Sequence, residues 1–188
     1  MEKPKKSAPA IFMHSMIGLT AGVAAVCLFL YYSGIFSDSI ALWIGIVAFM
    51  IFYHLGLRVV AGSVSKLFHI NYRHPWFRER QFEKKLYRLL RVKKWKGKAM
   101  TYQPEHFSLK EYSLDQIANT MAKSEVDHWI NMVISLSSIL FSLIWGELWI
   151  FVLTAAASML FDAQFILIQR YNRPRVLRLL KKNSASVV

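Results

Sequence analysis

The chain has 188 residues, of which 55% are hydrophobic, and its 24 Lys and Arg against 11 Asp and Glu give a formal net charge of +13. This apolar content excludes an ordinary soluble domain and is typical of a small integral membrane protein. A single cysteine, Cys27, excludes an intrachain disulfide and a zinc site built from cysteines.

The positive charge is clustered in three blocks, which are Lys3 to Lys6, Lys66 to Lys123, and Arg170 to Lys182. Basic blocks that flank apolar runs usually report membrane topology and contacts with anionic lipid. We therefore expect membrane lipids as partners, and no nucleic acid.

Two apolar runs near the N-terminus predict the first two membrane spans, at about residues 9–32 and 40–60. The first run is longer than the core of a secretory signal, so we expect a retained span rather than a cleaved signal. His54 and Arg58 lie four residues apart near the end of the second span, where we expect their polar tips to reach the headgroups.

A long polar loop over residues 62–127 follows the second span. Within it, the apolar stripe of residues 78–92 predicts a basic amphipathic helix that lies in the membrane interface. The next segment, residues 91–98, is rich in lysine and has two open interpretations. It is either a basic rim anchored by Trp95 or a clamp for an anionic group, such as a coenzyme A tail or a lipid headgroup.

A helical stripe that begins at Leu114, after a capping serine at 113 or 108, leads into a second long apolar run. This run, residues 130–168, would measure roughly 58 Å as one helix, whereas a hydrocarbon core is about 30 Å thick. Two spans, at about 129–144 and 148–168, fit better. Their natural turn is the segment 145–149, which holds a glycine, an acid and two tryptophans.

These elements predict an all-α integral membrane protein with four transmembrane helices, a single membrane domain over residues 1–188. A cytoplasmic amphipathic segment separates spans two and three, and residues 169–188 form a basic C-terminal tail. The only charged residues in the two short connections are Asp38 and Glu147, whereas both ends and the long loop are basic. The positive-inside rule then predicts a multi-pass protein of the cell membrane with both termini in the cytoplasm.

The best candidate for chemistry is Glu125 with His128, which share a helix face at a spacing of three residues. Here His128 would take a proton from a hydroxyl as general base while Glu125 orients the ring. Neighbouring cations can hold an anionic leaving group, so the set suits acyl transfer from a thioester to an alcohol. Asp162, inside the fourth span, is expected to face the protein interior with a partner and to share a face with Gln169.

Other chemistries have weaker support in the sequence. It contains no glycine-rich phosphate loop and no GxSxG elbow, so direct transfer is favoured over a covalent acyl-enzyme. A Glu-x-x-His pair also occurs in di-iron bundles, but those sites need two such pairs and the sequence offers one. We therefore expect neither a metal nor a cofactor.

Three motifs occur in an order that resembles a known family: Arg91 to Lys96 (RVKKWK), Glu125 to Ile130 (EVDHWI) and Ile168 to Arg175 (IQRYNRPR). The chain resembles the glycosyl-4,4'-diaponeurosporenoate acyltransferases of staphyloxanthin synthesis over roughly residues 76–182. The resemblance implies a membrane acyltransferase that esterifies a sugar hydroxyl on a lipid, carotenoid-like or other. The implied partners are an acyl donor, acyl-CoA or a similar thioester, and a lipid-linked hydroxyl acceptor.

The predicted catalytic residues are thus His128 and Glu125. Arg170, Arg173 and Arg175 would hold the donor's phosphates, and Tyr171 and Asn172 would position a carbonyl or the acceptor. The substrate-binding set as a whole is Lys94, Trp95, Lys96, Trp129, Asp162, Gln169, Arg170, Tyr171, Asn172, Arg173 and Arg175. Two alternatives stay open: a non-catalytic membrane subunit that binds anionic lipid or a partner protein through its basic face, and a different transfer reaction such as methylation or reduction.

Overall fold

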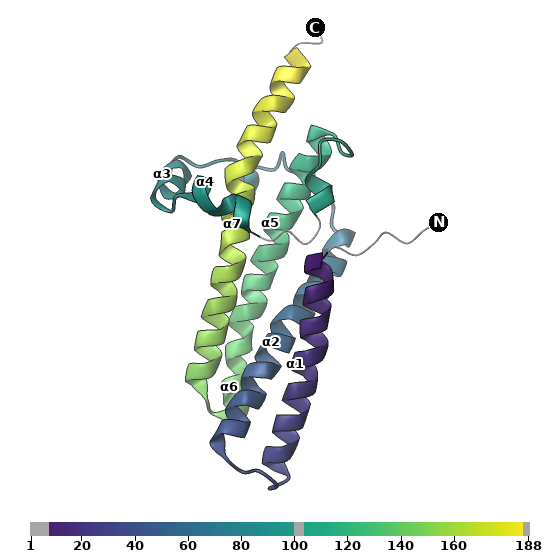
Figure 1. Ribbon diagram of the computed structural model, residues 1–188. Coiled ribbons are helices and arrows are strands. Elements are labelled where there is room, and N and C mark those ends of the chain that lie inside the picture. Colours follow the sequence, from purple (N-terminus) through teal and green to yellow (C-terminus); the bar gives the residue numbers. More distant parts are fainter. Residues whose placement is uncertain (1–7, 100–103, 186–188) are drawn as a thin grey trace, which may run out of the picture. The chain divides into compact units, whose positions relative to one another are not determined.

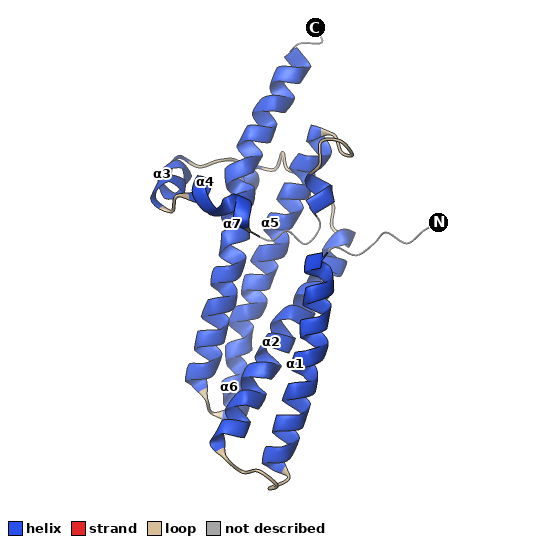
Figure 2. Cartoon of the chain, viewed as in Figure 1, coloured by secondary structure: helices blue, strands red, loops and turns tan. Residues whose placement is uncertain are grey.

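The computed structural model describes residues 8–99 and 104–185, and these residues form helices joined by loops, with no strand among them (Figure 2). The basic segment Lys3 to Lys6 lies outside the described residues. The helices are α1 (Ala8–Tyr32), α2 (Ser39–Val64), α3 (Gln81–Leu89), α4 (Val92–Trp95), α5 (Leu114–Ser137), α6 (Ser142–Trp145) and α7 (Leu148–Ala185). Short 3₁₀ turns are η1 (Ser65–Leu67), η2 (Pro75–Phe77), η3 (Lys96–Lys98), η4 (Pro104–Phe107) and η5 (Ser138–Phe141).

Four helical stretches are long and apolar enough to span a membrane, and they confirm the predicted all-α membrane fold. The stretches are Ala8–Tyr32, Ser39–Val64, Leu114–Trp145 and Leu148–Ala185. The last two contain 32 and 38 residues, which is roughly 48 and 57 Å of helix. Both therefore exceed the predicted spans 129–144 and 148–168 and continue beyond the apolar run.

The ends of the third helical stretch follow local chemistry that is visible in the sequence. At its start, Gln116 N donates to Ser113 Oγ at 3.3 Å while Ser113 N donates to Gln116 Oε1 at 2.9 Å, a reciprocal capping box. At its end, Gly146 adopts a left-handed conformation with φ of +75° and donates to the carbonyl of Ser142 at 2.7 Å. The predicted serine cap and the predicted glycine turn are both confirmed.

Helix α7 is longer than the predicted span 148–168. It continues through Pro174 as far as Ala185 and so includes most of the predicted basic tail 169–188 (Figure 1). Proline has no backbone N–H, so the helix lacks one internal hydrogen bond at this point. Arg178 Nε donates to the Pro174 carbonyl at 3.2 Å.

The described chain packs as two compact units, the first made of Met1–Ser63 and Ile130–Phe161 and the second of Val64–Trp129 and Asp162–Val188. Single-domain organisation stays a prediction. In the first unit, the core contains Ile46, Met50, Ile150 and Phe151. Helices α1 and α2 run antiparallel (Figure 1) and approach closely at Gly45, where an added Cβ would lie 2.9 Å from Leu28.

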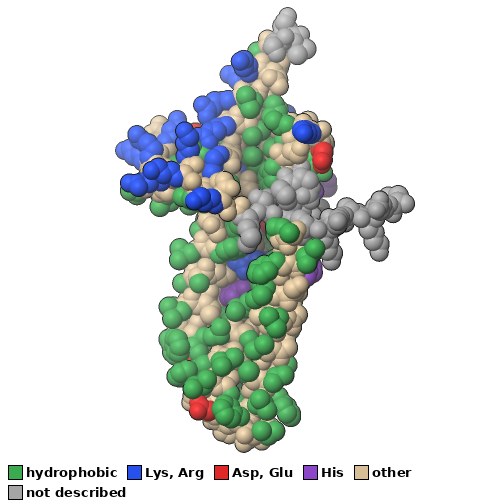
Figure 3. Space-filling model, viewed as in Figure 1, with side chains coloured by type: hydrophobic (Ala, Val, Ile, Leu, Met, Phe, Trp, Pro, Cys, Tyr) green, Lys and Arg blue, Asp and Glu red, His purple; other side chains and the backbone are tan. Residues whose placement is uncertain are grey.

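The outer surface of the first unit is strongly apolar, as Figure 3 shows for the face in view. Large exposed apolar side chains lie along α1, α2 and those parts of α5 to α7 that belong to this unit. Among them are Phe12, Phe29, Ile40, Val133, Leu143 and Leu153. Apolar patches of this extent are unusual on soluble proteins but normal where the neighbour is lipid.

A polar cluster inside the first unit differs from the sequence interpretation of His54 and Arg58 as headgroup contacts. His54 is buried and its Nδ1 lies 3.4 Å from Ser135 Oγ. Arg58 Nη2 donates to Ser158 Oγ at 2.7 Å, and Ser135 Oγ donates to the same oxygen at 2.9 Å. These side chains therefore contact one another inside the first unit.

The second unit has its own core, in which Tyr72 and Phe77 from the loop after α2 pack on Ala118 and Ala122 of α5. Helix α3 is shorter than the predicted 78–92, because Arg91 adopts a left-handed backbone conformation with φ of 49° and separates α3 from α4. The Lys and Arg side chains gather over these two short helices (Figure 3).

Candidate active site

A histidine and a carboxylate meet in the second unit. His128 on α5 and Asp162 on α7 are 34 residues apart, and Nδ1 of His128 lies 2.8 Å from Oδ1 of Asp162. The Asp162 side chain is fully buried, whereas that of His128 is 19% exposed. The imidazole also stacks on Phe165, with ring centroids 4.7 Å apart and planes 8° apart. The ring is therefore held on two sides while part of it stays accessible.

The contact with Asp162 bears on which ring nitrogen can accept a proton. When the carboxylate is ionised it can only accept, and then Nδ1 carries the hydrogen and the lone pair lies on Nε2. A carboxylate that holds a histidine in one tautomer is the arrangement that general bases use in acyl-transfer enzymes.

Glu125 occupies a different position from the one that the sequence suggested. Its carboxylate is fully buried and accepts from Arg170 Nε at 2.7 Å and from Arg173 Nη2 at 2.6 Å. The acid that contacts the His128 ring is Asp162 rather than Glu125. The i, i+3 spacing put Glu125 and His128 near one face, but the arginines of α7 bind the glutamate.

Arg170 and Arg173 bind groups inside the second unit. Arg170 Nη1 also pairs with Glu83 of α3, and its Nη2 donates to the carbonyl of Trp76 at 2.9 Å. Arg173 is 1% exposed and donates to the carbonyl of Phe77 at 3.1 Å through Nη2. Two glutamates thus balance two arginines, and the network connects η2, α3, α5 and α7. Both arginines thus pair with carboxylates of the protein itself, whereas the sequence predicted that they hold the donor's phosphates.

The neighbouring predicted residues have neutral or aromatic contacts. Gln169 is buried and its Nε2 donates to Ser124 Oγ at 3.2 Å. Trp129 remains 40% exposed and meets Trp76 edge to face, with ring centroids 6.4 Å apart.

Side chains of the first and third motifs surround Tyr171. Lys96 Nζ donates to Asn172 Oδ1 at 2.5 Å and lies 5.0 Å from the centre of the Tyr171 ring. The guanidinium of Arg175 stacks over the same ring at 3.8 Å. Burial and the nearby Arg175 lower the pKa of the Lys96 ammonium below its ordinary value.

A second tyrosine, Tyr87 of α3, meets Tyr171 edge to face with ring centroids 5.3 Å apart. Its hydroxyl donates to Glu83 Oε2 at 2.9 Å. Burial, and then this hydrogen bond, raises the pKa of Tyr87 well above its ordinary value, so the phenol stays protonated.

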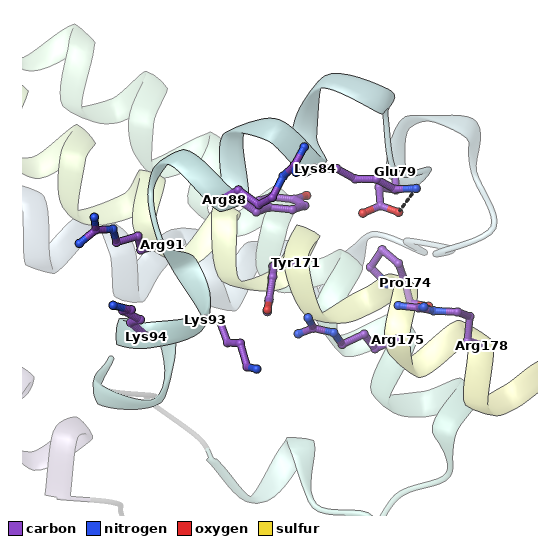
Figure 4. Close-up of a pocket in the computed structure, with 11 residues that line it drawn as sticks. Glu79, Lys84, Arg88, Arg91, Lys93, Lys94, Tyr171, Pro174, Arg175 and Arg178 are labelled. Atoms are coloured by element: carbon purple, nitrogen blue, oxygen red, sulfur yellow. Dashed lines mark hydrogen bonds and ion pairs between the residues drawn. The ribbon is translucent and has the colours of Figure 1, made fainter.

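Beside these tyrosines lies an open pocket of about 870 Å³, drawn in Figure 4. Lys94 and Arg175, both predicted to bind substrate, line it, whereas Trp95 donates its indole hydrogen to the carbonyl of Leu90 at 2.9 Å. The full lining is Glu79, Lys84, Tyr87, Arg88, Arg91, Lys93, Lys94, Tyr171, Pro174, Arg175 and Arg178.

The structure adds Glu83 to the candidate site, a residue that sequence reasoning missed. Glu83 was read as part of an amphipathic surface helix, yet it is 3% exposed and pairs with Arg170, which is 87 residues away. The four-residue spacing of Glu83 and Tyr87 was a usable local signal. No pattern in the sequence indicated the pairing with Arg170. Among the side chains that the structure describes, no group of three His, Cys, Asp or Glu is placed to hold a metal ion.

The fold and the site together define a multi-pass helical membrane protein with an oriented histidine and a separate cationic pocket. The family model for glycosyl-4,4'-diaponeurosporenoate acyltransferase matches residues 73–182, which is more than half of the chain. The chain belongs to this family and is therefore a membrane acyltransferase. The matched range contains the His128–Asp162 pair, the buried ion network and the pocket. No curated protein and no solved structure matches the chain.

Proposed function

We propose that the chain transfers a fatty acyl group from a thioester donor to a hydroxyl of a glycosylated lipid, with His128 as the general base. The single observation that carries the proposal is the 2.8 Å contact between His128 Nδ1 and the buried carboxylate of Asp162. Membership in a family named for acyl transfer to a glycosylated carotenoid acid supplies the reaction class.

The proposed step balances without a further reagent. Nε2 of His128 removes the proton of the acceptor hydroxyl as its oxygen attacks the thioester carbonyl carbon. The C–S bond then breaks, and the imidazolium returns the proton to the departing thiolate. Asp162 is a positioning residue, because it acts on the substrate only through the imidazole ring that it orients and stabilises.

We further propose that this chemistry occurs at the cytoplasmic face of the cell membrane. The distribution of charge supports this orientation. The connection between spans two and three is rich in Lys and Arg, whereas the only charged residues in the two short connections are Asp38 and Glu147. Acyl thioesters are made in the cytoplasm, so a cytoplasmic histidine can meet its donor directly.

The test is a double-mutant cycle on purified protein in lipid nanodiscs, measured as thiol release from acyl-CoA that depends on added glycolipid. We expect Asp162→Asn to lower kcat while KM for the donor stays unchanged, because the amide can still occupy the site but no longer stabilises the imidazolium. His128→Gln should cost more. The double variant should be no worse than His128→Gln alone, because both side chains act in one proton transfer.

Two results would overturn the proposal. One is a double variant whose loss in kcat equals the product of the two single losses, because the two side chains would then act independently. The other is wild-type protein that is folded, as judged by circular dichroism, and releases no thiol from any thioester in the presence of glycolipid.

A further inference from the structure

The pocket beside Tyr171 is strongly cationic (Figure 4). Seven of its lining residues are Lys or Arg, and one, Glu79, is acidic. Glu79 pairs with Lys84 at 4.0 Å across the rim. Among the side chains that the structure describes, none of the other six cations has an acidic partner within 4.0 Å: Arg88, Arg91, Lys93, Lys94, Arg175 and Arg178.

The contrast with Arg170 and Arg173 is informative. Those two arginines lie on the same helix as Arg175 and Arg178, but buried glutamates neutralise them. The pocket cations repel one another without such compensation. Converging like charges lower the free energy of a bound anion, since binding relieves their mutual repulsion.

Two features hold these cations in place. The guanidinium carbon of Arg175 lies over the Tyr171 ring, 3.8 Å from its centre, and this contact restricts where the side chain can point. Arg91 sits at the corner between α3 and α4 with φ of 49°, the one non-glycine residue of the described chain with positive φ. That conformation is unfavourable for a residue with a Cβ, and such strain is concentrated at functional sites.

We propose that this pocket binds the phosphate groups of a nucleotide-linked acyl donor, which identifies the donor as a coenzyme A thioester. The inference rests on the proposed acyl transfer from a thioester. A donor of this kind carries a diphosphate and a ribose phosphate, so several separate anionic groups can engage the six cations. A typical phospholipid headgroup presents a single phosphate and would leave most of them without a partner.

The pocket and the oriented histidine are separated along one helix. Arg175 follows Asp162 by thirteen residues on α7, which corresponds to roughly 20 Å of helix. The pantetheine arm of coenzyme A is a long flexible chain between the phosphates and the thioester. Phosphates at Arg175 and a thioester near His128 are therefore compatible with one bound donor.

The test uses purified full-length protein and compares the double variant Arg175→Gln/Arg178→Gln with wild type. The matched control is Lys181→Gln/Lys182→Gln, which removes the same charge from exposed positions on the same helix outside the pocket. The probe is adenosine 3',5'-bisphosphate, whose binding is measured by calorimetry in neutral detergent. We expect the pocket variant to raise its Kd by about tenfold or more, since a charge-assisted contact contributes about 1.5–3 kcal/mol, and the control to leave it unchanged.

A second measurement uses turnover. In the pocket variant, kcat/KM should fall for acyl-CoA but stay at the wild-type value for the matching acyl-pantetheine, which lacks the nucleotide. Equal losses for both donors, or unchanged bisphosphate binding, would overturn the pocket assignment. If the wild-type protein uses neither donor, the proposed acyl transfer from a thioester is itself wrong. If wild type uses both donors but the variant loses both equally, only the assignment of the pocket is wrong.

A third arm separates a nucleotide from a lipid headgroup. Bisphosphate binding is measured in nanodiscs of phosphatidylcholine alone and with added phosphatidylglycerol. We expect the pocket to bind the bisphosphate in both. Loss of that binding as phosphatidylglycerol is added, at constant ionic strength, would assign the pocket to a lipid headgroup and contradict the proposal.

Discussion

Replacing His128 with Gln is expected to lower kcat for acyl transfer by about 10²–10⁴-fold, the usual contribution of a positioned general base. A glutamine amide can still donate to Asp162 and fill the space beside Phe165, but it cannot take a proton from a hydroxyl. The loss should therefore lie in kcat, with little change in donor KM, and the thermal midpoint should stay near that of wild type. Thiol release and unfolding are measured on the same preparation.

His69→Gln is the matched control, because His69 is exposed in the loop after α2. It should retain wild-type turnover. A folded His128→Gln protein that turns over at the wild-type rate would remove the imidazole from the mechanism, whatever the function of the chain.

The largest effect on stability is expected from Glu125→Gln. The change removes the fully buried charge that pairs with both Arg170 and Arg173, and it leaves the 1% exposed Arg173 without a carboxylate. Breaking a buried ion pair at one partner costs about 3–5 kcal/mol. For a chain of this length that lowers Tm by roughly 6 °C or more. The readout is thermal unfolding in a fixed detergent.

Two further variants test whether the loss of stability comes from the buried charge pair. Glu111→Gln makes the same chemical change at an exposed position and should leave Tm unchanged. Adding Arg173→Met to Glu125→Gln should recover part of the loss, since the double variant no longer buries an unpaired charge. A Glu125→Gln protein as stable as wild type would show that the ion network contributes nothing to the fold.

The sequence predicted those parts of the fold that depend on local patterns. Apolar runs with the length of one or two bilayer spans predicted the four helices, and the Ser113–Gln116 and Gly146 end signals are also local. The length of α7 was not predictable in this way, because proline usually marks a helix end. Arg170 and Arg173, on the turn before Pro174, bind groups of η2, α3 and α5 and hold this helix in place.

The sequence predicted several residues of the candidate site, but it did not predict which of them contact one another. Composition and spacing singled out Glu125, His128 and Asp162, and a buried acid was expected to have a partner. Which acid meets the histidine depends on how α5 packs against α7 in the second unit, with 34 residues between the bonded pair. The spacing of Glu125 and His128 indicated a shared face, but it did not reveal that arginines 45 and 48 residues away bind the glutamate.

The arginines of the third motif are of two kinds. In the sequence Arg170, Arg173 and Arg175 are equivalent cations in an eight-residue stretch. Helical geometry turns them to different directions, so that two meet buried glutamates and one stacks on Tyr171 at the pocket. Only knowledge of the residues facing each position assigns these roles.

The most direct measurement of the central claim is the product itself. Purified protein in nanodiscs is incubated with an isotope-labelled acyl-CoA and a glycosylated carotenoid acid ester, and the lipids are analysed by mass spectrometry. The proposed function predicts an ester in which the labelled acyl group is attached to a sugar hydroxyl, formed by wild type and not by His128→Gln. Labelled acyl-CoA recovered intact from folded wild-type protein, with no acylated glycolipid, would contradict it.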